Sequence, residues 1–199
     1  VDMYAKCGML TKACLVLSEL PLRNVVSWNA LIAGYDQHEQ GWEALSSFVQ
    51  MQTEGLHPDP VTFVCSLRAC GRMGAMDKGK QIHTEIIHRG LLENNVILGN
   101  SLIYMYSKCG LLVKAEELLN KLPVRNEVSW NSLIAGYAQQ EQWHETLKCF
   151  GRMQSEGLSP DAVTFTCILK ACGNAGAIDK GEQIHNDILT RSLLDTDVL

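Results

Sequence analysis

The segment SWNALIAGY at residues 27–35 recurs as SWNSLIAGY at residues 129–137, 102 residues further along the chain. The same interval separates VTFVCSLRACGRMGAMDKGKQIH (61–83) from VTFTCILKACGNAGAIDKGEQIH (163–185), and MYAKCG (3–8) from MYSKCG (105–110). Long segments that recur at a fixed interval are typical of repeat architectures, in which neighbouring copies stack on one another. The chain is therefore expected to be an array of similar units.

Weaker similarity divides each 102-residue unit into segments of 35, 36 and 31 residues. The segments, including a truncated one at each end, are 1–24, 25–59, 60–95, 96–126, 127–161, 162–197 and 198–199. Within residues 25–59 two apolar runs have helical spacing, and polar residues 37–41 separate them. The first run is Trp28, Leu31, Ile32 and Tyr35, and the second is Ala44, Leu45, Phe48 and Met51.

Each segment is thus predicted to form a pair of helices. Gly55 and Pro58 are expected to end the second helix of residues 25–59, because glycine favours the helix stop and proline cannot continue a helix. One such pair cannot bury its apolar face alone, whereas stacked pairs bury a continuous core. The predicted fold is all-α: one continuous right-handed superhelical α-solenoid of tandem helix-turn-helix repeats.

The composition limits the classes of function. The chain has 199 residues, 46% hydrophobic and 20% charged, which is typical of an ordered globular protein, and no apolar run is long enough for a membrane span. A net charge of −5 counts against a nonspecific binder of polyanions. Eight cysteines include no C-x-x-C pair, so we expect small buried thiols in a reducing compartment, with no metal site and no cofactor.

The segments resemble the repeats of the pentatricopeptide (PPR) family. The P motif of that family resembles the 35-residue segment VVSWNALIAGY…EAL…F…MQTEGLHPD. Its L motif resembles the 36-residue segment with LRACG…GKQIH, and its S motif resembles the 31-residue segment with NSLIYMYSKCG…AEELL…LPVRN. Their order matches the PLS subclass of land-plant organelle RNA-editing factors. The resemblance covers essentially the whole chain. Tetratricopeptide repeats are the nearest alternative, but the glycine of their W-x-x-L-G pattern is missing after Trp28.

The resemblance implies that the chain binds single-stranded RNA, with about one base per repeat. The fifth and last residues of each repeat would specify the base, and an apolar residue in second position would clamp it. The specifying residues in the P and S repeats would be Asn29, Asp59, Asn100, Asn126, Asn131 and Asp161. Weaker specificity is expected of Val64, Asn95, Thr166 and Asp197 in the L repeats, and of Asn24 in the truncated S repeat. The clamping residues would be Val26, Val61, Ile97, Val128 and Val163.

The family's code implies that Asn with Asp prefers uracil, and that Asn with Asn prefers a pyrimidine. The expected register is 5′-U-N-Y-U-N-3′, where Y is a pyrimidine. Each residue also has an ordinary structural interpretation. Asn29 and Asn131 lie just inside a helix start, where Asn often bonds to the local backbone, and Asp59 and Asp161 follow proline in a turn.

By resemblance, the parent protein would be an editing or processing factor in the mitochondrion or chloroplast. Other editing-complex proteins are further expected partners, and the uncapped repeat ends would favour self-association. No catalysis is expected of this chain, and a deaminase would lie in a C-terminal domain beyond it. Two other functions remain open, a protein-binding scaffold and a cryptic zinc deaminase. His83 and Glu85 form the H-x-E triplet of such deaminases, but the downstream P-C-x-x-C is absent.

Overall fold

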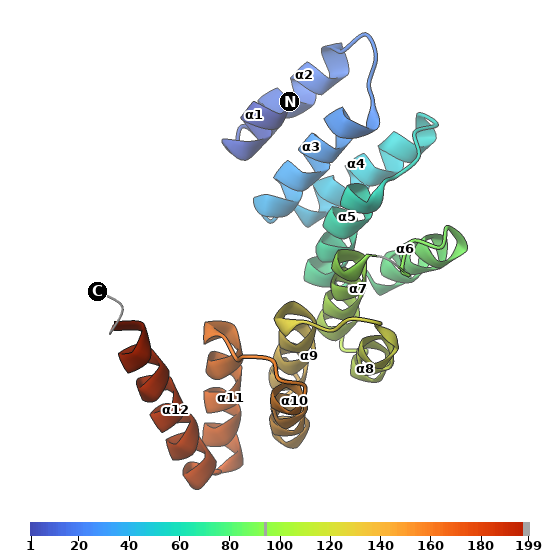
Figure 1. Cartoon of the computed structure of the whole chain (residues 1–199). Helices are drawn as coiled ribbons and strands as arrows, with labels where there is room; N and C mark the ends of the chain where they lie inside the picture. Colours follow the sequence, from blue (N-terminus) through green and yellow to red (C-terminus); the bar gives the residue numbers. More distant parts are fainter. Residues whose placement is uncertain (94, 197–199) are drawn as a thin grey trace. The chain divides into compact units, whose positions relative to one another are not determined.

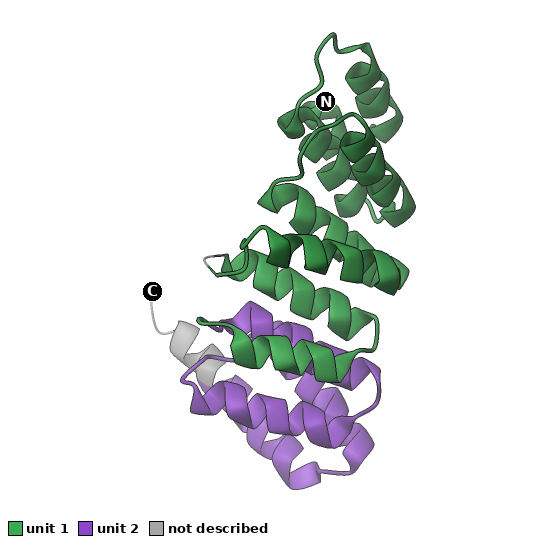
Figure 2. Ribbon diagram, turned by 90° about the vertical axis from the view of Figure 1, so that its right-hand side faces the viewer, with its two compact units in different colours: residues 1–124 green, residues 125–199 purple. Residues whose placement is uncertain are grey.

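The computed structural model describes residues 1–93 and 95–196 of the chain (Figure 1). Within these residues the secondary structure is entirely helical, which confirms the predicted all-α class. The chain divides into two compact units, Val1–Val124 and Arg125–Leu199 (Figure 2). Continuity of the solenoid from one unit to the next, and the P, L and S types of the repeats, stay predictions. Residues 198–199, expected to begin a further repeat, lie outside the described residues.

Unit 1 consists of four consecutive helix pairs. They are α1 (Asp2–Lys6) with α2 (Leu10–Glu19), α3 (Val25–Gln37) with α4 (Gly41–Thr53), α5 (Pro60–Met73) with α6 (Met76–His88), and α7 (Val96–Lys108) with α8 (Leu112–Lys121). The first helices contact one another in order, α1 with α3, α3 with α5, and α5 with α7. The second helices α2, α4 and α6 each pack against their own partner and against the first helix that follows. The first helices therefore form one layer and the second helices another.

Unit 2 repeats this arrangement with two helix pairs. They are α9 (Glu127–Gln139) with α10 (Trp143–Ser155), and α11 (Ala162–Ala175) with α12 (Ile178–Thr196). The first helices α9 and α11 pack side by side, and α10 lies against both of them. The junctions between helices 3–5 and 9–11 can therefore be compared as two copies of one local structure.

The apolar runs of residues 25–59 form the core that their spacing predicts. Trp28, Leu31 and Ile32 are buried on α3, and the complete second run is buried on α4. Tyr35 is only half-buried. Gly55 ends α4 with a φ of 78°, and Gly157 ends α10 with a φ of 77°. This left-handed conformation strains residues with a Cβ atom, so glycine is favoured at the stop that the sequence predicts.

The expectation of buried cysteines holds for only part of the set. Cys65, Cys70, Cys149 and Cys172 are buried, whereas Cys7 and Cys14 are exposed. Burial, with a smaller contribution from the neighbouring Cys109, raises the pKa of the Cys70 thiol to about 12. The spacing of the cysteines in the sequence excludes a C-x-x-C site. It does not tell which face of α1 or α2 packs against a neighbouring helix, so it could not predict the exposure of Cys7 and Cys14. No helix among the described residues is long and apolar enough to cross a membrane.

A buried ion cluster joins α3 to α5 in unit 1. The Asp36 carboxylate accepts from Arg68 Nε at 3.3 Å and also pairs with Arg72, which donates to the Asp36 carbonyl at 2.7 Å. The side chain of Asp36 is only 3% exposed. The corresponding residues 102 positions later are Ala138, Lys170 and Asn174, so the second copy lacks the carboxylate. The cluster is therefore specific to unit 1.

We expect Arg72→Ala to lower the free energy of unfolding by about 3 kcal/mol, because it leaves a buried carboxylate with one weaker partner. The double variant Asp36→Ala/Arg72→Asn copies Ala138 and Asn174 of the second copy. It should lose less stability than Arg72→Ala alone. Urea unfolding followed by circular dichroism checks both. A double variant that loses as much stability as Arg72→Ala, or more, would contradict the buried-charge explanation.

Candidate nucleic-acid interface

Five of the repeats end at a described residue, and this last residue, which is predicted to specify a base, is the N-cap of the next first helix. In each case the side-chain oxygen accepts from the backbone N–H three residues later, at 2.9 to 3.1 Å. The five residues are Asn24, Asp59, Asn95, Asn126 and Asp161. Asn and Asp are among the preferred N-cap residues, so this position has a structural role whatever else it does.

The fifth residue of the first P repeat bonds across the junction to the cap residue. Asn29 Nδ2 donates to both carboxylate oxygens of Asp59 at 2.9 Å. Thr62, the third residue of α5, donates from Oγ1 to Asn29 Oδ1 at 2.5 Å and accepts from the Asp59 backbone N–H at 3.1 Å. Three residues from two consecutive repeats thus form one hydrogen-bonded network. Asn29 does not bond to the local backbone, as its ordinary structural interpretation would require.

Unit 2 contains the same network. Asn131 Nδ2 donates to Asp161 Oδ2 at 2.8 Å, and Thr164 Oγ1 donates to Asn131 Oδ1 at 2.5 Å. The Asp161 backbone N–H donates to Thr164 Oγ1 at 3.2 Å. The two threonine side chains are fully buried. Because the arrangement occurs in both units at closely similar distances, it is a property of the junction that follows each 35-residue segment rather than of one site.

The two aspartates are held in the ionised state. Burial by itself raises the pKa of Asp59, but hydrogen bonds from the Thr62 backbone and the Asn29 amide outweigh it, and the pKa lies below its ordinary 3.8. Burial is likewise outweighed at Asp161, where Thr164 and Asn131 lower the pKa. An ionised carboxylate only accepts hydrogen bonds. The amide nitrogens of Asn29 and Asn131 must therefore face the aspartates, and the amide oxygens face the threonine hydroxyls.

This orientation leaves defined groups for a ligand. Each amide keeps one N–H proton and one lone pair beyond those that its Asp and Thr partners use. Asn29 is 9% exposed, and Asn131 is half-buried. The pair of groups, one donor beside one acceptor, matches the hydrogen-bonding edge of a nucleobase.

The five residues expected to clamp a base are exposed aliphatic side chains. Each is the second residue of a first helix, two positions after the residue that caps that helix. Their exposed fractions are 74% for Val26, 53% for Val61, 65% for Ile97, 57% for Val128 and 53% for Val163. A large apolar side chain exposed at the same helical position in every repeat is available to contact an apolar ligand surface.

The other expected residues lie in less uniform surroundings. Asn100 is 8% exposed on α7, while Asn126 caps α9 in the other unit. Val64 is half-buried on α5. Thr166 is exposed, and its hydroxyl donates to the Ala162 carbonyl at 2.7 Å. Asp197 lies outside the described residues.

Sequence reasoning did not identify Thr62 and Thr164. The signal was present as D-P-V-T at residues 59–62 and D-A-V-T at residues 161–164. A capping residue followed three positions later by a hydroxyl side chain indicates a reciprocal cap. The bond from the hydroxyl back to the preceding repeat, however, depends on how α3 packs against α5, which no local pattern specifies.

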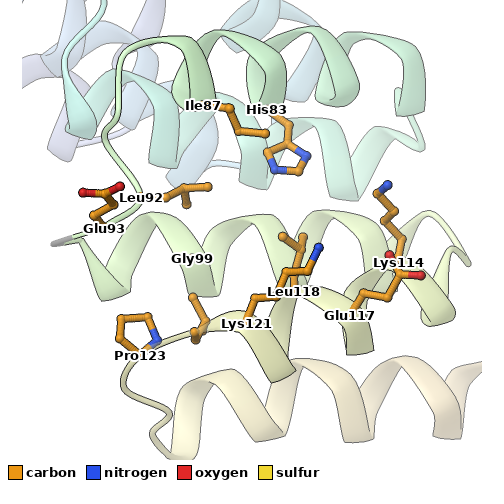
Figure 3. Close-up of a pocket in the computed structure, with 11 residues that line it drawn as sticks. His83, Ile87, Leu92, Glu93, Gly99, Lys114, Glu117, Leu118, Lys121 and Pro123 are labelled. Atoms are coloured by element: carbon orange, nitrogen blue, oxygen red, sulfur yellow. The ribbon is translucent and has the colours of Figure 1, made fainter.

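The H-x-E residues His83 and Glu85 have structural partners. His83 is buried beside a pocket of about 560 Å³ between α6, α7 and α8 (Figure 3). Its Nδ1 is hydrogen bonded to Tyr106 Oη at 2.8 Å. Burial, with a smaller effect of Lys114, lowers the pKa of His83. Glu85 pairs with Arg89. No group of three or more His, Cys, Asp or Glu side chains suited to a metal ion occurs in the described part of the chain.

Comparison with known proteins places these features in a family. The PPR repeat family matches residues 23–72 and 125–174, and the PPR repeat matches residues 100–126 and 163–193. The pentatricopeptide repeat-containing protein At4g30700 of Arabidopsis thaliana is 36% identical over 189 residues, which are 95% of this chain and 24% of that protein. The putative mitochondrial protein At3g13770 of the same species is 40% identical over 190 residues, 96% of this chain and 30% of that protein. The chain thus spans less than a third of the length of each of these relatives.

Solved structures show the same fold. The pentatricopeptide repeat protein PPR10, in complex with an 18-nucleotide psaJ RNA element, matches with a TM-score of 0.82 at 23% identity, over 96% of this chain and 29% of that one. The PPR domain of Arabidopsis thaliana protein-only RNase P 1, in complex with tRNA, matches with a TM-score of 0.64 at 15% identity, over 85% of this chain and 93% of that one. At these identities the likeness supports the fold alone.

The aspartate networks predict a specific sensitivity to acid. Their lowered pKa values mean that ionised Asp59 and Asp161 stabilise the fold above pH 3.8, and that this contribution is lost as the pH falls through the lower folded-state pKa. Between about pH 5 and pH 2, the melting temperature should therefore fall further for the wild type than for Asp59→Asn/Asp161→Asn. Exposed Asp77 and Asp179 give the control: Asp77→Asn/Asp179→Asn should follow the wild type. If the melting temperatures of all three proteins fell equally with pH, the result would contradict the role of the network in stability.

Proposed function

We propose that this chain, which belongs to the pentatricopeptide repeat family, binds single-stranded RNA and selects bases with the side chains of Asn29 and Asn131. The observation that carries the proposal is the recurrence, in both units, of one oriented amide beside exposed aliphatic side chains. A structural cap alone would not need a second polar side chain from the preceding repeat. The solved relatives support a nucleic-acid ligand, since PPR10 is in complex with RNA and protein-only RNase P 1 with tRNA.

The proposed contacts follow from the chemistry of a base. Its apolar faces would lie against the second-position residues, so that Val26 and Val61 would flank one base and Val128 and Val163 another. Its edge would meet the amide, which offers one donor and one acceptor. Contact with an unstacked base in this manner does not require a basic surface, which accords with the net charge of −5.

The register and the biological setting extend this proposal. The Asn–Asp pairs would each select uracil, and Asn100 with Asn126 would select a pyrimidine, giving 5′-U-N-Y-U-N-3′. The three repeat lengths in S, P, L order support a recognition tract of the PLS subclass, in a mitochondrial or chloroplast editing or processing factor. The tract would bind RNA and leave catalysis to another domain or partner.

Fluorescence-anisotropy titration at one stated salt concentration tests the proposal. The probes are a labelled RNA containing U-N-Y-U-N, the same RNA with purines at the three read positions, and matched DNA. The first RNA should bind most tightly, and Asn29→Ala/Asn131→Ala should weaken it about tenfold or more, because each variant loses a two-point contact to a base. Exposed Asn174 at the far end of α11 gives the matched control, Asn174→Ala, which should bind like the wild type.

Each other outcome has a definite meaning. Equal binding of all RNAs would contradict base selection. A folded protein that binds none of the RNAs would contradict RNA binding. It would favour a protein-binding scaffold, in which substitutions of Asn29 and Asn131 are tolerated.

A further inference from the structure

We infer that Thr62 and Thr164 are specificity-determining positioning residues, which hold the amides of Asn29 and Asn131 so that each selects uracil over cytosine. The inference rests on the proposed function and adds a residue of the following repeat to each reading site. Neither threonine needs to touch the base. Each would act through the asparagine that it holds.

The geometry fixes both ends of the amide. At the nitrogen end, Asn29 donates to the Asp59 carboxylate at 2.9 Å. At the oxygen end, it accepts from Thr62 Oγ1 at 2.5 Å. The Thr62 oxygen meanwhile accepts from the Asp59 backbone N–H at 3.1 Å. The hydroxyl proton has two acceptors within reach, Asn29 Oδ1 at 2.5 Å and Asp59 Oδ1 at 2.9 Å, and the Asn29 contact is the shorter. An amide held at one end still pivots about that contact, whereas an amide held at both ends has one position.

The hydroxyl residues that cap other first helices behave differently. Ser27 and Ser129 occupy the same third helical position as the threonines, and each forms the reciprocal cap with an asparagine. Their hydroxyls donate to the backbone carbonyl of their own cap residue, at 2.8 Å for Ser27 and 2.7 Å for Ser129. The capping function therefore does not require the bond that Thr62 and Thr164 make to the preceding repeat. That bond needs another explanation.

Discrimination between the two pyrimidines gives that explanation. Uracil presents an acceptor, O4, beside the donor N3–H, whereas cytosine presents the donor N4–H₂ beside the acceptor N3. At a fixed base position, an amide that pairs with uracil must turn over or shift to pair with cytosine. The aspartate opposes turning over, because its ionised carboxylate would face the amide oxygen. The threonine opposes the shift, because it anchors that oxygen. Together they leave uracil as the matching base.

The test compares RNAs that differ only by U or C at the first or the fourth position of U-N-Y-U-N. Thr62→Val keeps the shape of the side chain and removes the hydroxyl, so the U-over-C preference should fall about threefold or more at the first position only. Thr164→Val should reduce the preference at the fourth position only. Two controls match these variants. Ser27→Ala removes the same kind of cap at Asn24, which has no fifth-position partner in this chain. Thr146→Val removes a buried hydroxyl of α10 that donates to the carbonyl of the cap residue Gln142.

The outcomes separate this inference from the proposed function. A loss of preference that follows the substituted site supports the inference, because a weakened cap would lower the affinity for all four RNAs alike. Uniform weakening, or an unchanged preference at both positions, would overturn it while the wild type still selects uracil. A wild type without any preference would instead overturn the proposed function. The U-over-C preference is measured separately at the first and the fourth position, and circular dichroism identifies a variant that has unfolded. If both valine variants unfold, Thr62→Ala and Thr164→Ala take their place under the same criteria.

Discussion

The hydrogen-bonded network of Asn, Asp and Thr at the start of α5, and again at the start of α11, links the fold to the proposed function. In each copy a carboxylate caps one helix and also accepts from an amide on the preceding first helix. Neighbouring repeats are thus joined by directional bonds as well as by apolar packing. The same bonds orient the amide, so the contact that joins two repeats also prepares the proposed reading group.

This double use constrains the sequence. The last residue of a repeat must cap the next first helix, and the preferred caps are Asn, Asp, Ser, Thr and Gly. The residues that cap α3, α5, α7, α9 and α11 are all Asn or Asp, which also hydrogen bond with an amide or a base. Selection for a stable helix start and selection for a base preference therefore act on the same position. A change of base preference within this small set of residues leaves the helix capped.

Much of the fold could be predicted from sequence because it depends on local patterns. The spacing of Trp28, Leu31 and Ile32 indicates a buried helical face, and Gly55 indicates the helix end with positive φ. Features that depend on packing between helices could not be predicted. The Asp36 cluster with Arg68 and Arg72 needs α3 and α5 side by side, as does the bond from Thr62 to Asn29. Exposure of Cys7 and Cys14 depends likewise on which neighbours cover α1 and α2. The proposed reading positions follow from the resemblance to the family's motifs, and the repeat boundaries only give them residue numbers.

The most direct test of the account is the NMR spectrum of the side-chain amides of Asn29 and Asn131 in selectively labelled protein, recorded before and after addition of RNA. We expect each free-state amide to have one proton protected from exchange by its aspartate, and addition of the U-N-Y-U-N RNA to protect the second proton as well. Thr62→Val should affect only the Asn29 signals. Rapidly exchanging amides that do not respond to an RNA bound by the protein would contradict the central claim that these networks present the base-reading groups.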